Sequence, residues 1–218
     1  MRKGPRKRQD ILNTAAVLFA EKGYQDTAIQ DILDQLNTSK GSFYHHFKTK
    51  FEVLAALARD QALEAFQRYE AARPFEPGAA LNALLREASF LTPEHVSLLN
   101  NLIALGDDFE GVALLQTMQD AVLEAFLPAF VSVLMQLRQQ EDAVFGNEYS
   151  LKVAFASFLS ICALLFAALG RRDRREEALP LLRAARRHLE AALGLRAGAL
   201  VIIEAEEFER LKSRLSLG

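Results

Sequence analysis

The sequence of 218 residues contains one cysteine, six prolines and no tryptophan. A single cysteine, Cys162, cannot form a disulfide within the chain, so a reducing, cytosolic compartment is the simplest expectation. One thiol also excludes cysteine-rich zinc sites. The scarcity of proline and the absence of a long alternating pattern favour helices over strands. Half of the residues are hydrophobic and a quarter are charged, which excludes intrinsic disorder.

The chain also lacks a surplus of positive charge, because its net charge is −2. Taken alone, this value argues against binding to nucleic acid. The charge is unevenly distributed, however: residues 1–50 have a net charge of +4, and residues 51–218 have a net charge of −6. This asymmetry indicates two functional parts, with the N-terminal one facing a partner.

Five basic residues precede the first predicted helix: Arg2, Lys3, Arg6, Lys7 and Arg8. A basic segment followed by an apolar one is also typical of a signal peptide, but Asp10, Asn13 and Thr14 interrupt the apolar residues here. The basic segment either enters the minor groove of DNA as an arm or is a solvated tail. The sequence leaves both alternatives open.

Apolar residues recur at helical spacing through most of the chain, which predicts an all-α fold. The helices are expected at 9–22, 27–36, 40–47, 49–72, 79–91, 93–105, 112–140, 148–169, 177–193 and 204–215, with a short strand at 200–203 as an alternative. Capping boxes are predicted for Thr27 with Gln30 and for Thr49 with Glu52. Pro128 predicts a kink or a boundary inside the long helix.

A helix, a turn of three or four residues and a short second helix between Thr27 and Lys50 predict a helix-turn-helix. The second helix suits a DNA groove because its residues supply hydrogen-bond donors, and Gly41 permits a close approach of the backbone. Phe43 and Phe47 anchor this helix in a small core. The donors are Lys40, Ser42, Tyr44, His45 and His46. A metal site is not expected at the two histidines, because they are adjacent and no third ligand is near.

The segments Thr27-Ala28-Ile29-Gln30-Asp31-Ile32 and Ser39-Lys40-Gly41-Ser42-Phe43-Tyr44-His45-His46-Phe47-Lys48-Thr49-Lys50 resemble the TetR/AcrR family of bacterial transcriptional regulators. The resemblance covers about residues 9–58. Two positions depart from the family pattern: Asn37 stands where glycine is usual, and Thr38 stands where a small apolar residue is usual. Asparagine is a fair substitute for glycine in a left-handed turn.

The resemblance implies a DNA-binding domain at residues 1–50 and a ligand-binding and dimerisation domain at residues 51–218, joined by a connecting helix. It assigns phosphate contacts to some residues and base contacts to others, with lysine favouring guanine. The implied DNA-binding residues are Thr27, Ser39, Lys40, Gly41, Ser42, Tyr44, His45, His46 and Lys50. Lys40 would contact a base edge, and Tyr44 and His45 could contact either a phosphate or a base.

The resemblance also implies a homodimer through helices at about 148–169 and 177–193, and hence a palindromic operator. The uncharged segment 153–170 reaches the lower length limit of a membrane span, so a membrane-anchored protein is an alternative. Cys162 lies in this segment and is expected to be a buried, unreactive thiol.

The middle helices are expected to line a mostly apolar pocket for an unknown small-molecule effector. The candidate ligand-binding residues are His95, Asn101, Met118, Gln119, Tyr149 and Phe155. The resulting expectation is a ligand-responsive transcriptional regulator, most often a repressor in this family. A ligand-independent DNA-binding protein is the other alternative. No catalytic motif supports an enzyme, and no cofactor is expected.

Overall fold

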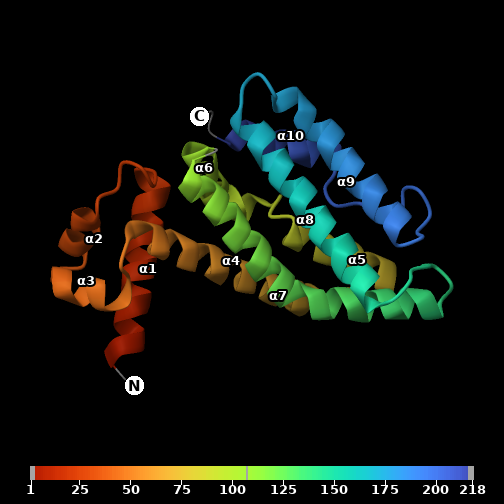
Figure 1. The fold of residues 1–218 in the computed structure, drawn as a ribbon, viewed down its shortest axis with the longest axis horizontal. Coiled ribbons are helices and arrows are strands. Elements are labelled where there is room, and N and C mark those ends of the chain that lie inside the picture. Colours follow the sequence, from red (N-terminus) through yellow and green to blue (C-terminus); the bar gives the residue numbers. More distant parts are fainter. Residues whose placement is uncertain (1–2, 107, 216–218) are drawn as a thin grey trace.

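A computed structural model of the chain describes residues 3–106 and 108–215, and the described residues form helices and no strands (Figure 1). The α-helices are α1 (Lys3–Glu21), α2 (Ile29–Gln35), α3 (Lys40–His46), α4 (Lys50–Ala72), α5 (Pro77–Ala88), α6 (Val96–Leu105), α7 (Phe109–Gln139), α8 (Glu148–Gly170), α9 (Ala178–Ala192) and α10 (Ala205–Arg214). Two 3₁₀ helices, Pro93–His95 and Arg175–Glu177, precede α6 and α9. The predicted all-α class is confirmed, and the alternative strand at 200–203 does not form.

The helices α1, α2 and α3 lie at one end of the molecule, and α4 runs from them into the larger group formed by α5 to α10 (Figure 1). In that larger group, α7 packs against α4 and α5, and α8 packs against α9. The connecting role expected for the fourth helix is therefore visible in its position.

Side-chain caps explain where α3 and α4 begin. The Ser39 hydroxyl accepts a hydrogen bond from the amide of Ser42 at 3.2 Å, and the Thr49 hydroxyl accepts one from the amide of Glu52 at 3.1 Å. The Glu52 carboxylate in turn accepts from the amide of Lys48 at 2.7 Å. These caps satisfy amide groups that have no partner within the helix.

The expected capping box of Thr27 with Gln30 is wrong. The N-cap of α2 is Ala28, one residue later than expected, and its amide donates to the carboxylate of Asp31 at 2.8 Å. The Thr27 hydroxyl instead donates to the carbonyl of Gly23 at 2.7 Å. A carboxylate three residues after Ala28 accepts from the backbone amide more strongly than the neutral amide of Gln30 would.

One further expectation about helix boundaries is wrong, and one choice between two alternatives is decided. Helix α1 begins at Lys3, so the basic residues from Lys3 to Arg8 belong to the helix and do not precede it; Arg2 lies outside the described residues. Pro128 lies inside α7 and does not end it. Figure 1 shows α7 changing direction partway along its length, as expected for a proline that removes one backbone hydrogen bond.

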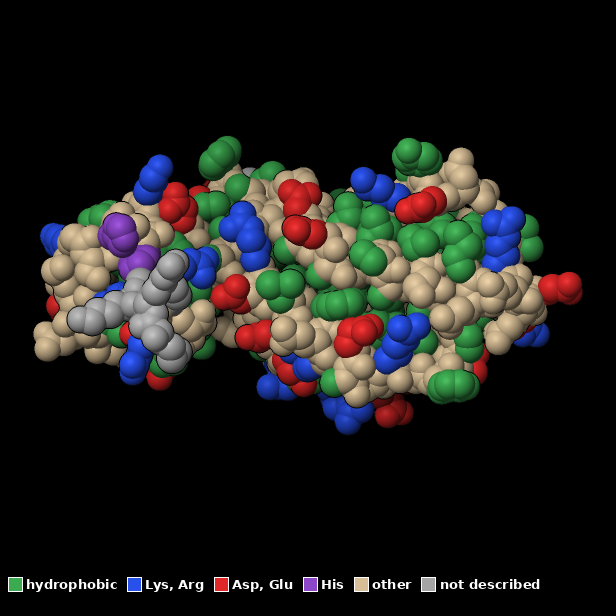
Figure 2. All heavy atoms as spheres, turned by 90° about the horizontal axis from the view of Figure 1, so that it is seen from below, with side chains coloured by type: hydrophobic (Ala, Val, Ile, Leu, Met, Phe, Trp, Pro, Cys, Tyr) green, Lys and Arg blue, Asp and Glu red, His purple; other side chains and the backbone are tan. Residues whose placement is uncertain are grey.

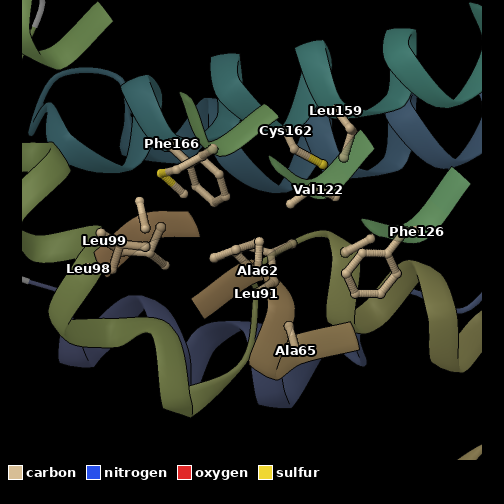
Figure 3. Close-up of a cluster of buried hydrophobic side chains, with 14 of the residues drawn as sticks. Ala62, Ala65, Leu91, Leu98, Leu99, Val122, Phe126, Leu159, Cys162 and Phe166 are labelled. Atoms are coloured by element: carbon tan, nitrogen blue, oxygen red, sulfur yellow. The ribbon is translucent and has the colours of Figure 1, made fainter. Parts of the chain in front are cut away.

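The core of the larger group is formed by apolar side chains from α4, α6, α7 and α8. Figure 3 shows Ala62 of α4, Leu99 of α6, Phe126 of α7 and Cys162 of α8 pointing into the same region. Cys162 is buried, and burial raises the pKa of its thiol to about 12. The expectation of an unreactive thiol agrees with this position.

Two helices, α7 and α8, are long and apolar enough to cross a membrane by length and composition. Core helices of proteins that span no membrane meet the same criterion. Here the two helices pack against each other and against α4, α5 and α9.

Candidate DNA-binding interface

The short helix α3 is held in place by two aromatic anchors and presents a polar face. Phe43 and Phe47 are buried, as predicted, and pack with Ile11, Leu12 and Ile32 in the core of α1 to α3. The turn before α3 contains Asn37 with a φ of 46°, in the left-handed region that was predicted for this asparagine. The fixed turn and the anchors set the orientation of α3.

The opposite face of α3 is open to solvent. Lys40, Gly41 and His45 are exposed, and the Tyr44 ring is 51% exposed and lies edge-on to Phe43. A large, exposed aromatic side chain carrying a hydroxyl is suited to packing on a sugar–phosphate backbone and donating to it. These residues form the candidate interface.

His45 and His46 are closer together than expected from adjacent helical positions. Their ring centroids are 4.9 Å apart in an edge contact, so the two rings lie side by side. The pKa of His46 is lowered, first by desolvation and then by the charges of His45, Arg8 and Lys7. Within the described part of the chain, no cluster of three or more His, Cys, Asp or Glu side chains suits a metal ion.

The basic residues of α1 lie beside α3. The Arg8 guanidinium lies over the Phe47 ring, 5.2 Å from its centroid, and the effect of Lys7 and Arg8 on the His46 pKa reflects the same proximity. Figure 2 shows Lys, Arg and His side chains together at the end of the molecule formed by α1 to α3. The N-terminal turns of α1 therefore extend the basic surface of α3.

The structure gives Lys50 a different role from the implied phosphate contact. Its ammonium donates to three backbone carbonyls between α1 and α2, at 2.6 Å to Tyr24, 3.2 Å to Gln25 and 2.8 Å to Thr27. It also lies 4.2 Å from the centroid of the Tyr24 ring. All three donors of this ammonium group are used within the protein.

Thr27 is also unsuited to the implied phosphate contact. Its side chain is 1% exposed, and its hydroxyl donates to Gly23 as described above. A donor that is buried and already used cannot reach a phosphate without rearrangement. We therefore omit Thr27 and Lys50 from the proposed DNA contacts.

Hydrogen bonds attach the α1–α2 loop to the corner between α6 and α7. The amide of Tyr24 donates to the side-chain oxygen of buried Asn101 at 2.9 Å, and its hydroxyl donates to Glu110 at 3.1 Å. The Gln25 side chain donates to the carbonyl of Ala104 at 2.9 Å. Burial, followed by the charge of Glu110, raises the pKa of Tyr24. Sequence reasoning missed this contact, because the residues are about 80 positions apart and carry no motif.

The candidate ligand-binding residues do not come together in one pocket. Both ring nitrogens of buried His95 have partners, Thr92 at 3.0 Å and Arg68 at 3.1 Å. Asn101 holds the α1–α2 loop, as described above, and Phe155 stacks on Phe130 in the core. These three side chains are therefore structural in this conformation.

Tyr149 is 80% exposed near the beginning of α8 and lines neither of the two cavities between the helices described next. Met118 and Gln119 do line one small cavity of about 20 Å³, together with Cys162 and Phe166. A larger neighbouring cavity of about 300 Å³ lies between α6, α7 and α8. The two cavities share Leu115 and Phe166 as lining residues.

Comparisons with known proteins agree with this geometry. Residues 11–57 match the family model of bacterial regulatory proteins of the tetR family. The chain is 38% identical over 64 residues to the transcriptional repressor KstR2 of Mycolicibacterium smegmatis, which covers 29% of this chain and 31% of that protein. The matching segments span between 28% and 40% of the first curated relatives.

Solved structures match over nearly the whole chain. A TetR-family transcriptional regulator from Pectobacterium atrosepticum has a TM-score of 0.63 at 20% identity, covering 88% of this chain and 98% of that one. RolR in complex with resorcinol has a TM-score of 0.59 at 18% identity, covering 99% and 97%. Residues 11–57 therefore match the tetR family, and the chain as a whole shares the fold of these solved structures.

Proposed function

We propose that the chain is a transcriptional regulator that binds operator DNA through α3 and acts as a repressor. The observation that carries this proposal is the exposed polar face of α3, oriented by buried Phe43 and Phe47. The proposed contacts are Ser39, Lys40, Gly41, Ser42, Tyr44, His45 and His46, with Lys7 and Arg8 adding phosphate contacts from α1. A regulator of this kind acts in the cytoplasm, in agreement with the single buried cysteine.

We propose two domains: residues 1–50 bind DNA, and residues 51–218 form the dimer and bind the effector. The net charges of these segments support this division, because the second segment is acidic and repels phosphates. DNA contact is then confined to the N-terminal part of each subunit.

We propose a homodimer formed by α8 and α9. Val153 and Leu164 are 65% and 59% exposed, and together with Tyr149 they lie on one face of α8, since their spacings are close to whole helical turns. Large apolar side chains in a row on one face are typical of a surface that is buried by a partner. A two-fold dimer presents two copies of α3 to a palindrome, about 34–36 Å apart or at a multiple of one DNA turn.

Selection of bound sequences from random duplex DNA tests the DNA-binding proposal. We expect a palindromic consensus and a large loss of affinity in Tyr44→Ala, with an unchanged thermal midpoint because Tyr44 is exposed. Recovery of sequences without a consensus would contradict specific binding. Glu64→Gln on α4, an exposed position remote from α3, serves as the matched control.

Sedimentation of the wild-type chain and of Leu164→Glu tests the dimer. We expect a dimer at micromolar concentration for the wild type, and a folded monomer with weaker operator binding for the variant. A monomeric wild type with full operator affinity would refute the dimer.

We further propose that a small molecule bound among α5 to α8 releases the operator by changing the position of α4 and of α1 to α3. The cavity between α6, α7 and α8 and the hydrogen bonds of Asn101 and Ala104 to the α1–α2 loop support this regulation. The ligand must bind the two conformations with different affinities. Operator affinities measured with and without the bound ligand test it, and equal affinities would favour a ligand-independent DNA-binding protein.

A further inference from the structure

The cavity between α6, α7 and α8 has a chemical character that narrows the class of ligand. Its volume is about 300 Å³, at the lower end of the range for small-molecule sites. The walls include Leu102, Ile103, Leu115 and Phe166, which suit an aromatic ring or a short branched chain. Phe166 and Leu115 also line the smaller cavity near Met118.

One positive charge lies at the edge of this apolar cavity. Among the described residues that line it, Arg171 is the one with a charged side chain. Its guanidinium faces Asp173 at 3.4 Å, and both side chains are more than half exposed, so this ion pair is weak. A carboxylate on an apolar ligand would form a better pair, since part of it would be shielded from water by the cavity walls.

We propose that this cavity binds a small aromatic carboxylate, with the ring between Leu102 and Phe166 and the carboxylate paired to Arg171. This ligand class rests on residues of this chain, and its regulatory consequence rests on the function proposed above. The ligand is held at the end of the cavity next to the C-terminus of α6.

The same segment of α6 contacts both the cavity and the α1–α2 loop. Leu102 and Ile103 line the cavity, while Asn101 and the carbonyl of Ala104 accept hydrogen bonds from Tyr24 and Gln25. Ala104 itself also lines the cavity. An occupant that displaces this segment necessarily changes the geometry of both hydrogen bonds.

Close packing leaves α6 little freedom to move toward α8. A Cβ atom at Gly170 would lie 3.2 Å from the Cγ2 atom of Ile103, so Gly170 permits a direct contact between the two helices. Because packed interfaces do not deform continuously, a ligand that enters between α6 and α8 displaces α6 as a unit. Such a displacement reaches the α1–α2 loop through the hydrogen bonds of Asn101 and Ala104.

Calorimetry on the full chain with phenylacetate and with its neutral counterpart, phenylacetamide, tests the ligand class. We expect phenylacetate to bind at least about tenfold more tightly, because the amide lacks the charge that pairs with Arg171. Arg171→Gln should remove this preference and leave the thermal midpoint unchanged. The control Arg172→Gln removes an exposed neighbour that does not line the cavity and should keep the preference.

Ala167→Leu tests the location of the site, since Ala167 lines the cavity and a larger side chain fills it. We expect weaker binding of both compounds to this variant. The proposal is overturned if phenylacetate does not bind at millimolar concentration, if the two compounds bind equally to the wild type, or if Arg171→Gln or Ala167→Leu changes nothing.

Gln25→Ala tests the connection to DNA binding, because it removes the hydrogen bond to Ala104 while leaving the cavity intact. The variant should bind phenylacetate as the wild type does and show a smaller effect of phenylacetate on operator affinity; an unchanged effect would refute this route. Calorimetry without DNA keeps the two proposals distinguishable. A chain that binds an operator but no carboxylate refutes the ligand class alone, and a chain that binds carboxylate but no DNA refutes the proposed function.

Discussion

The role of Lys50 can be decided by replacing it with methionine, which keeps the length of the side chain and removes its charge. The family pattern implies a phosphate contact for this residue, whereas the structure shows it bound to the carbonyls of Tyr24, Gln25 and Thr27. The two roles predict different measurable effects of Lys50→Met. The difference lies in the thermal midpoint and in the salt dependence of operator binding.

The magnitude follows from the hydrogen bonds that are lost. A hydrogen bond to a charged group contributes about 1.5–3 kcal/mol. Lys50 is only partly buried, so water replaces some of what is lost, and we expect a total of about 2–3 kcal/mol for the three bonds. For a chain of this size, this corresponds to a fall of about 4–12 °C in the thermal midpoint.

The assay combines thermal unfolding with operator titrations at several salt concentrations. If Lys50 is internal, the variant loses stability and some affinity, while the slope of log affinity against log salt is unchanged. Each phosphate contact contributes about 0.9 to that slope, so a lost contact in each subunit of a dimer would reduce it by about 1.8. An unchanged midpoint together with a reduced slope would refute the internal role. Lys48→Met, at an exposed neighbouring position, is the matched control for the loss of charge alone.

Three further predictions concern buried residues. The pKa of His95 is lowered to about 4 by burial, followed by the charge of Arg68. The unfolded chain binds a proton below pH 6.5 that the folded chain binds only near pH 4, so the free energy of unfolding falls by about 3 kcal/mol as pH drops through this window. His95→Gln should flatten the profile of unfolding free energy against pH. An equally steep profile in the variant would contradict the lowered pKa of His95. Phe43→Ala should lower the free energy of unfolding, measured in urea, by about 3–5 kcal/mol and abolish operator binding, because this anchor of α3 is fully buried. A variant as stable as the wild type would show that other contacts hold α3. Cys162 is 4% exposed with a pKa raised to about 12, so a thiol reagent should modify it only after unfolding, and rapid reaction of the native chain would refute its burial.

Local signals in the sequence were sufficient for the helix-turn-helix. The caps by Ser39 and Thr49, the left-handed Asn37 and the anchors Phe43 and Phe47 all follow from neighbouring residues. The misassigned cap of α2 shows the limit of such reasoning. Thr27 with Gln30 fits the capping pattern, but the Thr27 hydroxyl donates to the carbonyl of Gly23, and the Asp31 carboxylate accepts from the amide of Ala28 instead.

The candidate ligand-binding residues were harder to predict, because their type alone does not say what they face. His95 and Asn101 are polar residues among apolar ones, which indicates either a pocket or an internal hydrogen bond. Their partners, Arg68 and Tyr24, lie 27 and 77 positions away, and only the packing of the helices brings them together. Arg171 follows the uncharged segment 153–170, and only the cavity that it borders makes it a candidate for ligand binding.

The sequence by itself determined the all-α class, the positions of most helices and the DNA-binding motif, since these depend on periodicity, caps and turns within a few residues. Tertiary structure decided that Lys50 holds a loop, that Asn101 joins α6 to the α1–α2 loop, and that a cavity opens beside Arg171. The physical reason is that each of these features requires groups distant in sequence to meet. These long-range contacts depend on how the helix faces pack, and the local sequence around each residue does not indicate them.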